Sequence, residues 1–491
     1  MRHFATFTIA AAMLFWGSGC MAAPPVPVGR SDLAAVYLEF ESAYAAAALI
    51  DDAAIAEMNR GFDRASLLFF NGQTAPVIRE LQSLAARLPK ARDDAAARIA
   101  RALKATSEPA TLIAGSVSAW SLRISSMYAV ESRDAREAKF TLNLRKSSGE
   151  AVHAVDWSGG ELAGTFVDSR VELTPLGATI SPGVYDIVLD TTDGFARRIG
   201  RLQVVARSLD ARRIENVAAL EKIQSKDAAI QSALATCKAR NALLVDQPAD
   251  TASLPLLVSM EGLADQIESE VAALRESRNP YRRRPGDTWR VITDSSGEYP
   301  VRVYAPRDAE RNAPLPLLIA LHGAGGDENM FFEGYGAGLM KALADEHQFI
   351  VAAPLSYPFT LNPGLADRLI EMLEHDYAID RSRIYLLGHS LGVVGANSIL
   401  TLRAPRFAGV VAMAGVISLV GVTDAPPMLV ISGELDPLSA PDRIRAAVKA
   451  AQDDGYNVEW RELKQYGHTL LVGAKLREAM TWLLAKRRTA E

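Results

Sequence analysis

A serine between two glycines is the clearest candidate for chemistry in the chain. Residues 388–392 are Gly-His-Ser-Leu-Gly and match the pattern G-x-S-x-G. In that pattern the serine lies on a sharp, strained strand-to-helix turn that requires small neighbours, and its hydroxyl projects above the sheet. Residues 383–387 are typical of a buried strand and residues 393–402 of a helix. This context predicts that Ser390 is a nucleophile.

A nucleophilic serine needs a base to take its proton. The chain has seven histidines, at positions 3, 153, 322, 347, 375, 389 and 468. His468 follows the last predicted strand, in a loop at the carboxyl edge of the sheet, where a base can reach Ser390. The other six have other expected places: the leader (His3), a β-rich region (His153), helix ends (His347 and His375), a glycine-rich loop (His322) and a position pointing away from the serine (His389). We therefore expect His468 to be the base.

An acid must orient that histidine. Residues 432–437 are Ser-Gly-Glu-Leu-Asp-Pro and continue from a predicted strand at 428–432. Asp436 would complete the chain order Ser, Asp, His, and a buried carboxylate there would fix the tautomer of the imidazole. Glu434 in the same loop is the competing acid, and an aspartate before proline is also a common turn former.

A glycine-rich loop follows the third predicted strand. Residues 321–327 are Leu-His-Gly-Ala-Gly-Gly-Asp, and such a loop allows backbone N–H groups close to a substrate. We expect the N–H groups of Ala324 and Leu391 to form an oxyanion hole. A phosphate loop is the alternative, but the Gly-Lys-Ser/Thr ending and the G-x-G-x-x-G pattern are both missing. No cofactor or metal is therefore predicted.

Polar and aromatic residues in nearby loops could line a substrate pocket. The candidates at this edge of the sheet are Asn329, Phe331, Phe332 and Tyr357. Ordinary packing of the loops onto the sheet would explain the same residues.

The elements that must position these residues lie after Thr288. Short apolar runs alternate there with amphipathic helical patterns, which is typical of βαβ units. We expect an α/β domain over 288–491 with an eight-stranded, mostly parallel sheet. Its predicted strands are 289–292, 301–305, 317–321, 349–353, 384–388, 409–414, 428–432 and 458–463.

Four further regions precede this domain. An Ala-rich helical region is expected over 24–110 and a β-rich, sandwich-like domain with regular turn signals over 111–207. Helical patterns at 208–244 and 252–277 predict an antiparallel helical hairpin over 208–278. Residues 279–287 have the Pro- and Arg-rich composition of a linker.

The first 23 residues predict export. A weakly positive start, an apolar run at 4–16 and small residues up to Ala23 are typical of a secretory signal peptide. We expect a secreted or periplasmic protein, with a lipid anchor on Cys20 as the alternative. Cys237, in a helical pattern, is expected to be a core residue. Beyond the leader no apolar stretch reaches 18 residues, so no membrane span is predicted.

Composition narrows the function classes. The 491 residues include 53 Lys and Arg against 58 Asp and Glu, for a net charge of −5, which argues against a nucleic-acid partner. Hydrophobic content of 49% and charged content of 23% exclude a largely disordered chain. Two cysteines are too few for a disulfide framework.

Residues 321–327, 383–392, 433–436 and 467–468 together resemble the α/β-hydrolase superfamily. The resemblance covers 288–491 and is greatest to secreted esterases related to polyhydroxyalkanoate depolymerases and feruloyl esterases, and to prolyl-oligopeptidase-type hydrolase domains. Val393, where many relatives have glycine, is a departure, and residues 415–426 leave no room for a lipase-type lid.

The resemblance implies hydrolysis of a small-molecule or polymeric carboxylic ester through an acyl-enzyme on Ser390. A serine peptidase is an alternative, although the chain lacks propeller repeats. A binding protein on an inactive hydrolase fold is the other alternative. Oligomeric state is not predicted.

Overall fold

The computed structural model describes residues 26–488 with short internal gaps. The gaps are 117–118, 132–138, 159–160, 164–165, 174–175, 177, 192, 249–256 and 312. The predicted signal peptide, including Cys20, lies outside the described residues. Within the described part of the chain, no helix is long and apolar enough to cross a membrane.

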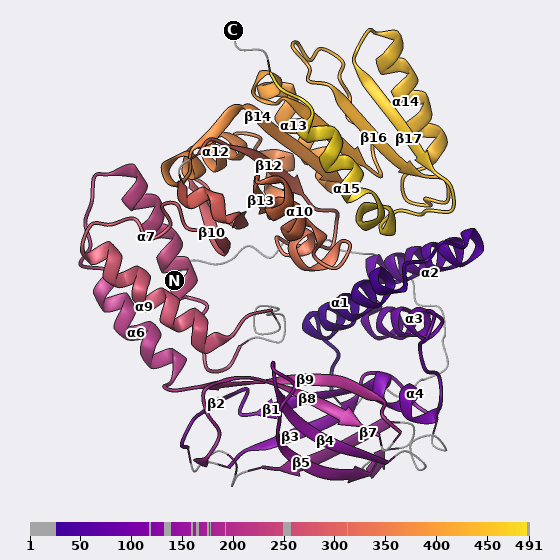
Figure 1. Ribbon diagram of the computed structural model, residues 1–491, viewed down its shortest axis with the longest axis vertical. Helices are drawn as coiled ribbons and strands as arrows, with labels where there is room; N and C mark the ends of the chain where they lie inside the picture. The colour runs from indigo at the N-terminus through magenta and orange to yellow at the C-terminus, as the bar shows by residue number, and fades with distance from the viewer. Residues whose placement is uncertain are drawn as a thin grey trace.

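An eight-stranded sheet is the centre of the C-terminal part (Figure 1). Its strands lie in the order β10-β11-β13-β12-β14-β15-β16-β17. Their bounds are Gly286–Asp294 (β10), Gly297–Ala305 (β11), Leu315–Leu321 (β12), Ile350–Pro354 (β13), Ile379–His389 (β14), Gly409–Met413 (β15), Met428–Gly433 (β16) and Val458–Leu463 (β17). The five pairs from β13 to β17 are parallel, so their carboxyl ends share one edge.

The prediction of a mostly parallel sheet is corrected, because the sheet is mixed. Strands β10 and β11 pair antiparallel, and β11 also pairs antiparallel with β13. The turn between the first two strands is too short for the crossover that parallel strands need. In it, Asp294 Oδ1 accepts the backbone N–H groups of Ser296 at 2.7 Å and Gly297 at 3.1 Å.

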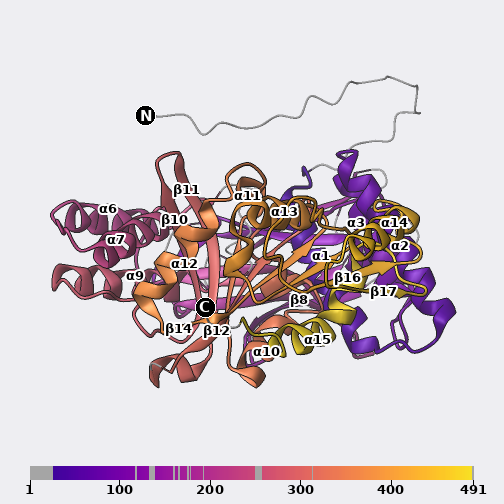
Figure 2. The ribbon, with the colours of Figure 1, turned by 90° about the horizontal axis from the view of Figure 1, so that it is seen from above.

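Helices cover both faces of this sheet (Figure 2). Along β12, Leu317 and Ile319 face one layer, whereas Leu318 and Ala320 face the other, as the two-residue period of a strand requires. Helices α12 (Leu365–Asp376), α13 (Leu391–Arg403) and α14 (Pro441–Asp453) pack on the first face. Helices α10 (Leu339–His347) and α15 (Leu470–Leu484) pack on the second.

Three N-terminal helices pack together and against the large sheet's loops. They are α1 (Arg30–Ala47), α2 (Asp52–Phe70) and α3 (Thr74–Ala86), and they share a core that includes Phe40, Phe62 and Ile78. Helix α2 begins where the side chain of Asp51 accepts the N–H of Ala54, an N-cap that satisfies a free donor. Figure 1 shows these helices between the large sheet and the smaller sheets of the N-terminal half.

Two smaller sheets follow a short helix, α4 (Ala95–Ala102). Their strand orders are β1-β3-β7-β6 and β2-β9-β8-β4-β5, and side chains of both sheets form one core. The strands begin at Leu103, before the predicted start at 111. The bounds are Leu103–Glu108 (β1), Thr111–Ile113 (β2), Ser121–Ser126 (β3), Lys139–Lys146 (β4), Ala151–Ser158 (β5), Glu161–Ala163 (β6), Phe166–Glu172 (β7), Gly183–Asp190 (β8) and Ala196–Val205 (β9).

The region predicted as a helical hairpin contains a helix break. Helices α6 (Leu209–Leu220) and α7 (Ala228–Asn241) occupy the stretch predicted as one helix, and α9 (Met260–Arg275) follows. The break lies where Asp227 caps α7 by accepting the N–H of Ala229. Cys237 is buried in the core of these helices as expected, and burial raises the pKa of its thiol to about 12.

The segment predicted as a linker, 279–287, packs against these helices. Tyr281 is buried and donates its hydroxyl to Glu270 at 2.9 Å, and Arg284 pairs with the same carboxylate at 2.7 Å. Glu270 also pairs with the buried Arg240 at 3.1 Å. Glu270 therefore connects α7 and α9 to the segment that leads into the first strand of the large sheet.

Candidate active site

Ser390 lies on the turn between β14 and α13, as the motif predicted. Its backbone has φ 51° and ψ −112°, a strained conformation for any residue with a side chain. A Cβ at Gly392 would overlap the carbonyl group of Leu321, so only glycine lets the turn pass this close to β12. The strand, the turn and the helix together hold the Ser390 hydroxyl above the carboxyl edge of the sheet.

A chain of hydrogen bonds links Ser390, His468 and Asp436. Ser390 Oγ lies 2.8 Å from His468 Nε2, and His468 Nδ1 lies 3.0 Å and 2.9 Å from the two carboxylate oxygens of Asp436. Because a carboxylate only accepts, Nδ1 carries the proton and Nε2 is free to take one from the serine. The structure brings all three predicted residues together with the geometry of a nucleophile, a base and an orienting acid.

The Asp436 side chain is fully buried and held in place by its backbone. Its Oδ1 accepts the N–H groups of Leu438 and Ser439, both at 2.8 Å. Glu434, the competing acid, is exposed and accepts the N–H of Gln465 instead. The structure therefore places Asp436, and not Glu434, on the imidazole.

Two backbone N–H groups are free near Ser390. Within the described residues, neither the N–H of Ala324 nor that of Leu391 has a hydrogen-bond acceptor. Leu391 is the first residue of α13, where N–H groups have no partner inside the helix. The loop of Ala324 passes close to the serine, since a Cβ at Gly323 would lie 3.4 Å from the Ser390 Cβ. Both groups are thus available to a developing oxyanion.

Two neutral histidines brace the surrounding loops. His322 Nε2 accepts the N–H of Ser356 at 3.0 Å, so its Nδ1 donates to the carbonyl of Gly323 at 2.8 Å. Burial lowers the pKa of His322 to about 4. His389 lies under the site, where it donates from Nε2 to the carbonyl of His468 at 3.0 Å, and burial holds its pKa well below the ordinary range.

Tyr335 connects the glycine-rich loop to His389. Its buried hydroxyl accepts the N–H of Gly323 at 3.3 Å and donates to His389 Nδ1 at 2.8 Å. A continuous hydrogen-bond network therefore runs from the glycine-rich loop through Tyr335 and His389 to the backbone of His468. Sequence analysis did not assign this role to either residue.

The N-terminal helix α2 contributes two polar side chains that bind the loop of Gly467 and His468, which we call the base loop. Asn59 Oδ1 accepts the N–H of Gly467 at 2.9 Å, and Asp63 Oδ1 accepts the N–H of His468 at 3.1 Å. A Cβ at Gly467 would overlap the Asp63 carboxylate, so glycine is required for this approach. Burial raises the pKa of Asp63 to about 6, and the nearby Asp436 raises it further against the opposing effect of the hydrogen bond.

Sequence reasoning missed Asn59 and Asp63. The only sign in the sequence is that both lie one turn apart on the buried face of an amphipathic helix, where polar residues are unusual.

A cavity of about 190 Å³ opens beside Ser390. Residues of the glycine-rich loop line one side, and residues of α1, α2 and α3 line the other. Of the predicted pocket residues, Asn329 lines the cavity. Phe331 and Phe332 do not, because both are fully buried between η3 (Met330–Gly334) and the sheet. Tyr357 is 42% exposed and instead accepts the N–H of Gly325 at 2.6 Å.

Among the described residues, no group of three or more His, Cys, Asp or Glu side chains could hold a metal ion.

Neither a protein-family model nor a curated protein matches the chain. Solved structures similar to it include S-formylglutathione hydrolase of Staphylococcus aureus, with 16% identity, a TM-score of 0.34 and coverage of 41% of this chain and 98% of that one. S-formylglutathione hydrolase of Agrobacterium tumefaciens shares 17% identity with a TM-score of 0.35, over 40% of this chain and 95% of that one. The feruloyl esterase module of Clostridium thermocellum shares 14% identity with a TM-score of 0.36, over 43% and 93% of the two chains.

By name, these similar structures are two S-formylglutathione hydrolases and a feruloyl esterase module. The similarity covers 40–43% of the chain. At these identities and TM-scores it carries nothing about substrate, so the reaction is inferred from the site itself.

Proposed function

We propose that the protein is a serine hydrolase that cleaves carboxylic esters through an acyl-enzyme on Ser390. The observation that carries the proposal is the hydrogen-bonded chain from Ser390 through His468 to the buried Asp436. Free N–H groups of Ala324 and Leu391 beside the serine support it, because acyl transfer develops negative charge on the carbonyl oxygen.

In the first half-reaction, Ser390 Oγ attacks the ester carbonyl carbon and His468 Nε2 takes the hydroxyl proton. The carbonyl oxygen becomes an oxyanion that accepts hydrogen bonds from Ala324 and Leu391, while Asp436 stabilises the imidazolium. The bond to the alcohol oxygen then breaks, and His468 returns the proton to the departing alcohol. The acyl group remains bound to Ser390.

In the second half-reaction, water replaces the alcohol. His468 takes a proton from the water as its oxygen attacks the acyl carbon, and the same two N–H groups hold the second oxyanion. The bond to Ser390 Oγ breaks, and His468 returns the proton to that oxygen. The products are a carboxylic acid and the regenerated enzyme.

Comparing ester with peptide substrates tests the proposal. We expect the purified protein to hydrolyse p-nitrophenyl esters faster than peptide p-nitroanilides, and Ser390→Ala to abolish both activities. Faster cleavage of the anilides would make the protein a peptidase. Ester turnover retained by Ser390→Ala would exclude the proposed nucleophile.

We also propose that the chain is exported to the periplasm or the medium. The signal-like composition of residues 1–23 supports this. Cell fractionation with intact mass measurement should find a chain cleaved after Ala22 or Ala23 outside the cytoplasm. A chain that retains residues 1–23 in the cytoplasm would contradict export, and a lipid on Cys20 would contradict a free mature chain.

A further inference from the structure

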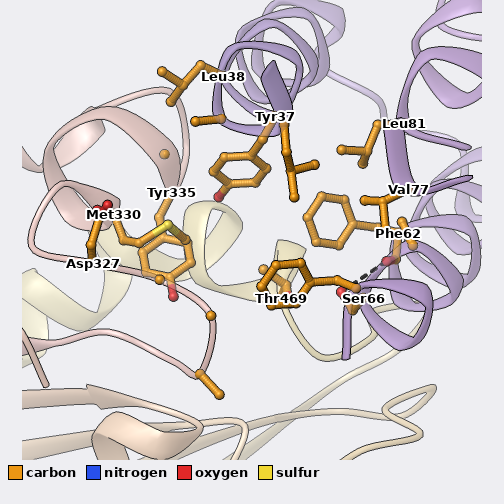
Figure 3. A pocket seen from close by; sticks show the side chains of 18 of the residues that line it. Tyr37, Leu38, Phe62, Ser66, Val77, Leu81, Asp327, Met330, Tyr335 and Thr469 are labelled. Atoms are coloured by element: carbon orange, nitrogen blue, oxygen red, sulfur yellow. Dashed lines mark hydrogen bonds between the residues drawn. The ribbon is translucent and has the colours of Figure 1, made fainter. Parts of the chain in front are cut away.

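The cavity beside Ser390 is built by two distant parts of the chain (Figure 3). One wall comes from the loops that carry the site, including Met330 and Tyr335. The opposite wall is apolar and comes from the N-terminal helices. Its side chains are Tyr37 and Leu38 of α1, Phe62 of α2, and Val77 and Leu81 of α3.

The apolar wall is held against the base loop by direct hydrogen bonds. Asn59 and Asp63 of α2 accept the N–H groups of Gly467 and His468. On α1, the buried Glu41 accepts the hydroxyl of Tyr37 at 2.9 Å. Helix α2 is therefore held against the loop of His468, and α1 and α3 share a core with α2.

Charged side chains that line the cavity, within the described part of the chain, are all paired. Arg30 and Asp327 form an ion pair at 3.5 Å. Glu333 pairs with Arg302 and Lys341, each at 2.9 Å. A carboxylate or ammonium group in the cavity would lose part of its hydration without gaining a free partner, which is unfavourable.

We propose that this cavity binds the acyl group of the substrate, and that the acyl group is uncharged, apolar and about six to eight carbons long. This inference rests on the proposed ester hydrolysis and adds the substrate class. The length follows from volume, since an apolar cavity of about 150 Å³ accommodates benzene with its six carbons. The cavity of about 190 Å³ is slightly larger.

The acyl group fits this position beside Ser390 better than the alcohol does. It stays bound through both half-reactions, whereas the alcohol must leave before water can attack. The cavity also adjoins Ala324, whose N–H group holds the oxygen of the acyl carbonyl in the proposed mechanism.

A series of p-nitrophenyl esters tests the acyl preference. Burial of one methylene is worth about fourfold in an equilibrium constant, so four additional methylenes allow a gain of up to about 250-fold. We expect kcat/KM for the hexanoate and octanoate to exceed that for the acetate by at least about 30-fold. The palmitate and a hemisuccinate, which carries a charge, should fall below both. A flat profile, or a maximum at the acetate or the hemisuccinate, would overturn the inference.

Substitutions in the apolar wall test whether this cavity determines the preference for acyl length. Ala34 of α1 lines the cavity and is half-buried, so Ala34→Phe should fill part of it. The expected result is a loss of about tenfold or more in kcat/KM for the hexanoate with little change for the acetate. Ala45→Phe, at an exposed position of the same helix, is the matched control and should leave both unchanged.

Enlarging the cavity should have the opposite effect. Leu38→Ala removes a half-buried side chain from the wall and should move the optimum toward longer acyl groups. Equal losses for acetate and hexanoate in a folded Ala34→Phe variant, together with an unmoved optimum in Leu38→Ala, would overturn the assignment of this wall. If Ala34→Phe does not fold, the optimum in Leu38→Ala decides alone.

Failure of this inference is distinct from failure of the proposed function. If acetate is hydrolysed through Ser390 but acyl length has no effect, only the substrate class is wrong. If no ester is hydrolysed, the proposed function itself fails.

Discussion

The backbone N–H of His468 donates to the carboxylate of Asp63 at 3.1 Å, across 405 positions of sequence. The candidate base therefore has two acidic neighbours, because Asp436 bonds its imidazole and Asp63 bonds its backbone. The first belongs to the α/β sheet and the second to an N-terminal helix. The N-terminal helices are thus part of the candidate active site.

Asp63→Asn should change the pH dependence of stability. Burial raises the pKa of Asp63 from 3.8 to about 6, so the folded protein binds this proton more tightly than the unfolded chain does. The stability that this bound proton gives the folded protein is complete below pH about 4 and is lost as pH rises through about 6. The variant should therefore be more stable than the wild type at pH 8, by about 3 kcal/mol, with the difference vanishing near pH 4. Urea unfolding at both pH values measures this, and a variant less stable than the wild type at pH 8 would contradict the shift.

Gly467→Ala should impair activity through Asp63. The added Cβ overlaps the Asp63 carboxylate, so the base loop or α2 must move and His468 loses its position. A displacement of about 1 Å can cost about 100-fold in kcat. The double variant Gly467→Ala with Asp63→Ala removes the overlap and should recover part of this loss. A double variant less active than Gly467→Ala would show that Asp63 is not the source of the clash.

Asp436→Asn should nearly abolish turnover while leaving substrate binding intact. Loss of the orienting carboxylate permits the wrong imidazole tautomer, which costs about 10⁴-fold in kcat in comparable sites. Glu434→Gln in the same loop is the control and should stay within about twofold, since Glu434 faces solvent. Steady-state kinetics on p-nitrophenyl acetate compares them, and a larger effect at Glu434 would reverse the assignment of the acid.

Ser390→Gly should be more stable than Ser390→Ala. The φ of 51° at this position costs about 1–3 kcal/mol for a residue with a Cβ and little for glycine. Part of that gain is offset by the greater freedom of glycine in the unfolded chain, which leaves about 1 kcal/mol. Thermal unfolding of the two inactive variants measures the difference. Equal stability of the two variants would mean that the backbone of the turn at Ser390 is not strained.

The positions of Ser390, Asp436 and His468 could be predicted because each lies in the turn or loop that follows a strand of the parallel part of the sheet. Strands of this kind appear in sequence as short apolar runs, and their carboxyl ends share an edge. Local pattern and chain order were therefore sufficient. The short connection between the predicted strands 289–292 and 301–305 already favoured an antiparallel pair. The antiparallel pairing of β11 with β13 could not be foreseen, since an apolar run does not encode direction.

Asp63 and the apolar wall could not be predicted for a different reason. The amphipathic pattern of α2 indicates that one face is buried but not what buries it. The sequence also does not show what Phe331 and Phe332 pack against, since aromatic residues beside a site can pack inward as readily as toward a substrate. Contacts between segments hundreds of residues apart depend on the folded arrangement of the domains.

Covalent labelling is the most direct test of whether Ser390 is an activated nucleophile. The purified protein would be treated with a fluorophosphonate, which phosphonylates activated serines, and the adduct located by peptide mapping. We expect one adduct, on Ser390, absent from Ser390→Ala and formed much more slowly in Asp436→Asn. A folded wild-type protein with no adduct on Ser390, or an adduct on another serine, would contradict it.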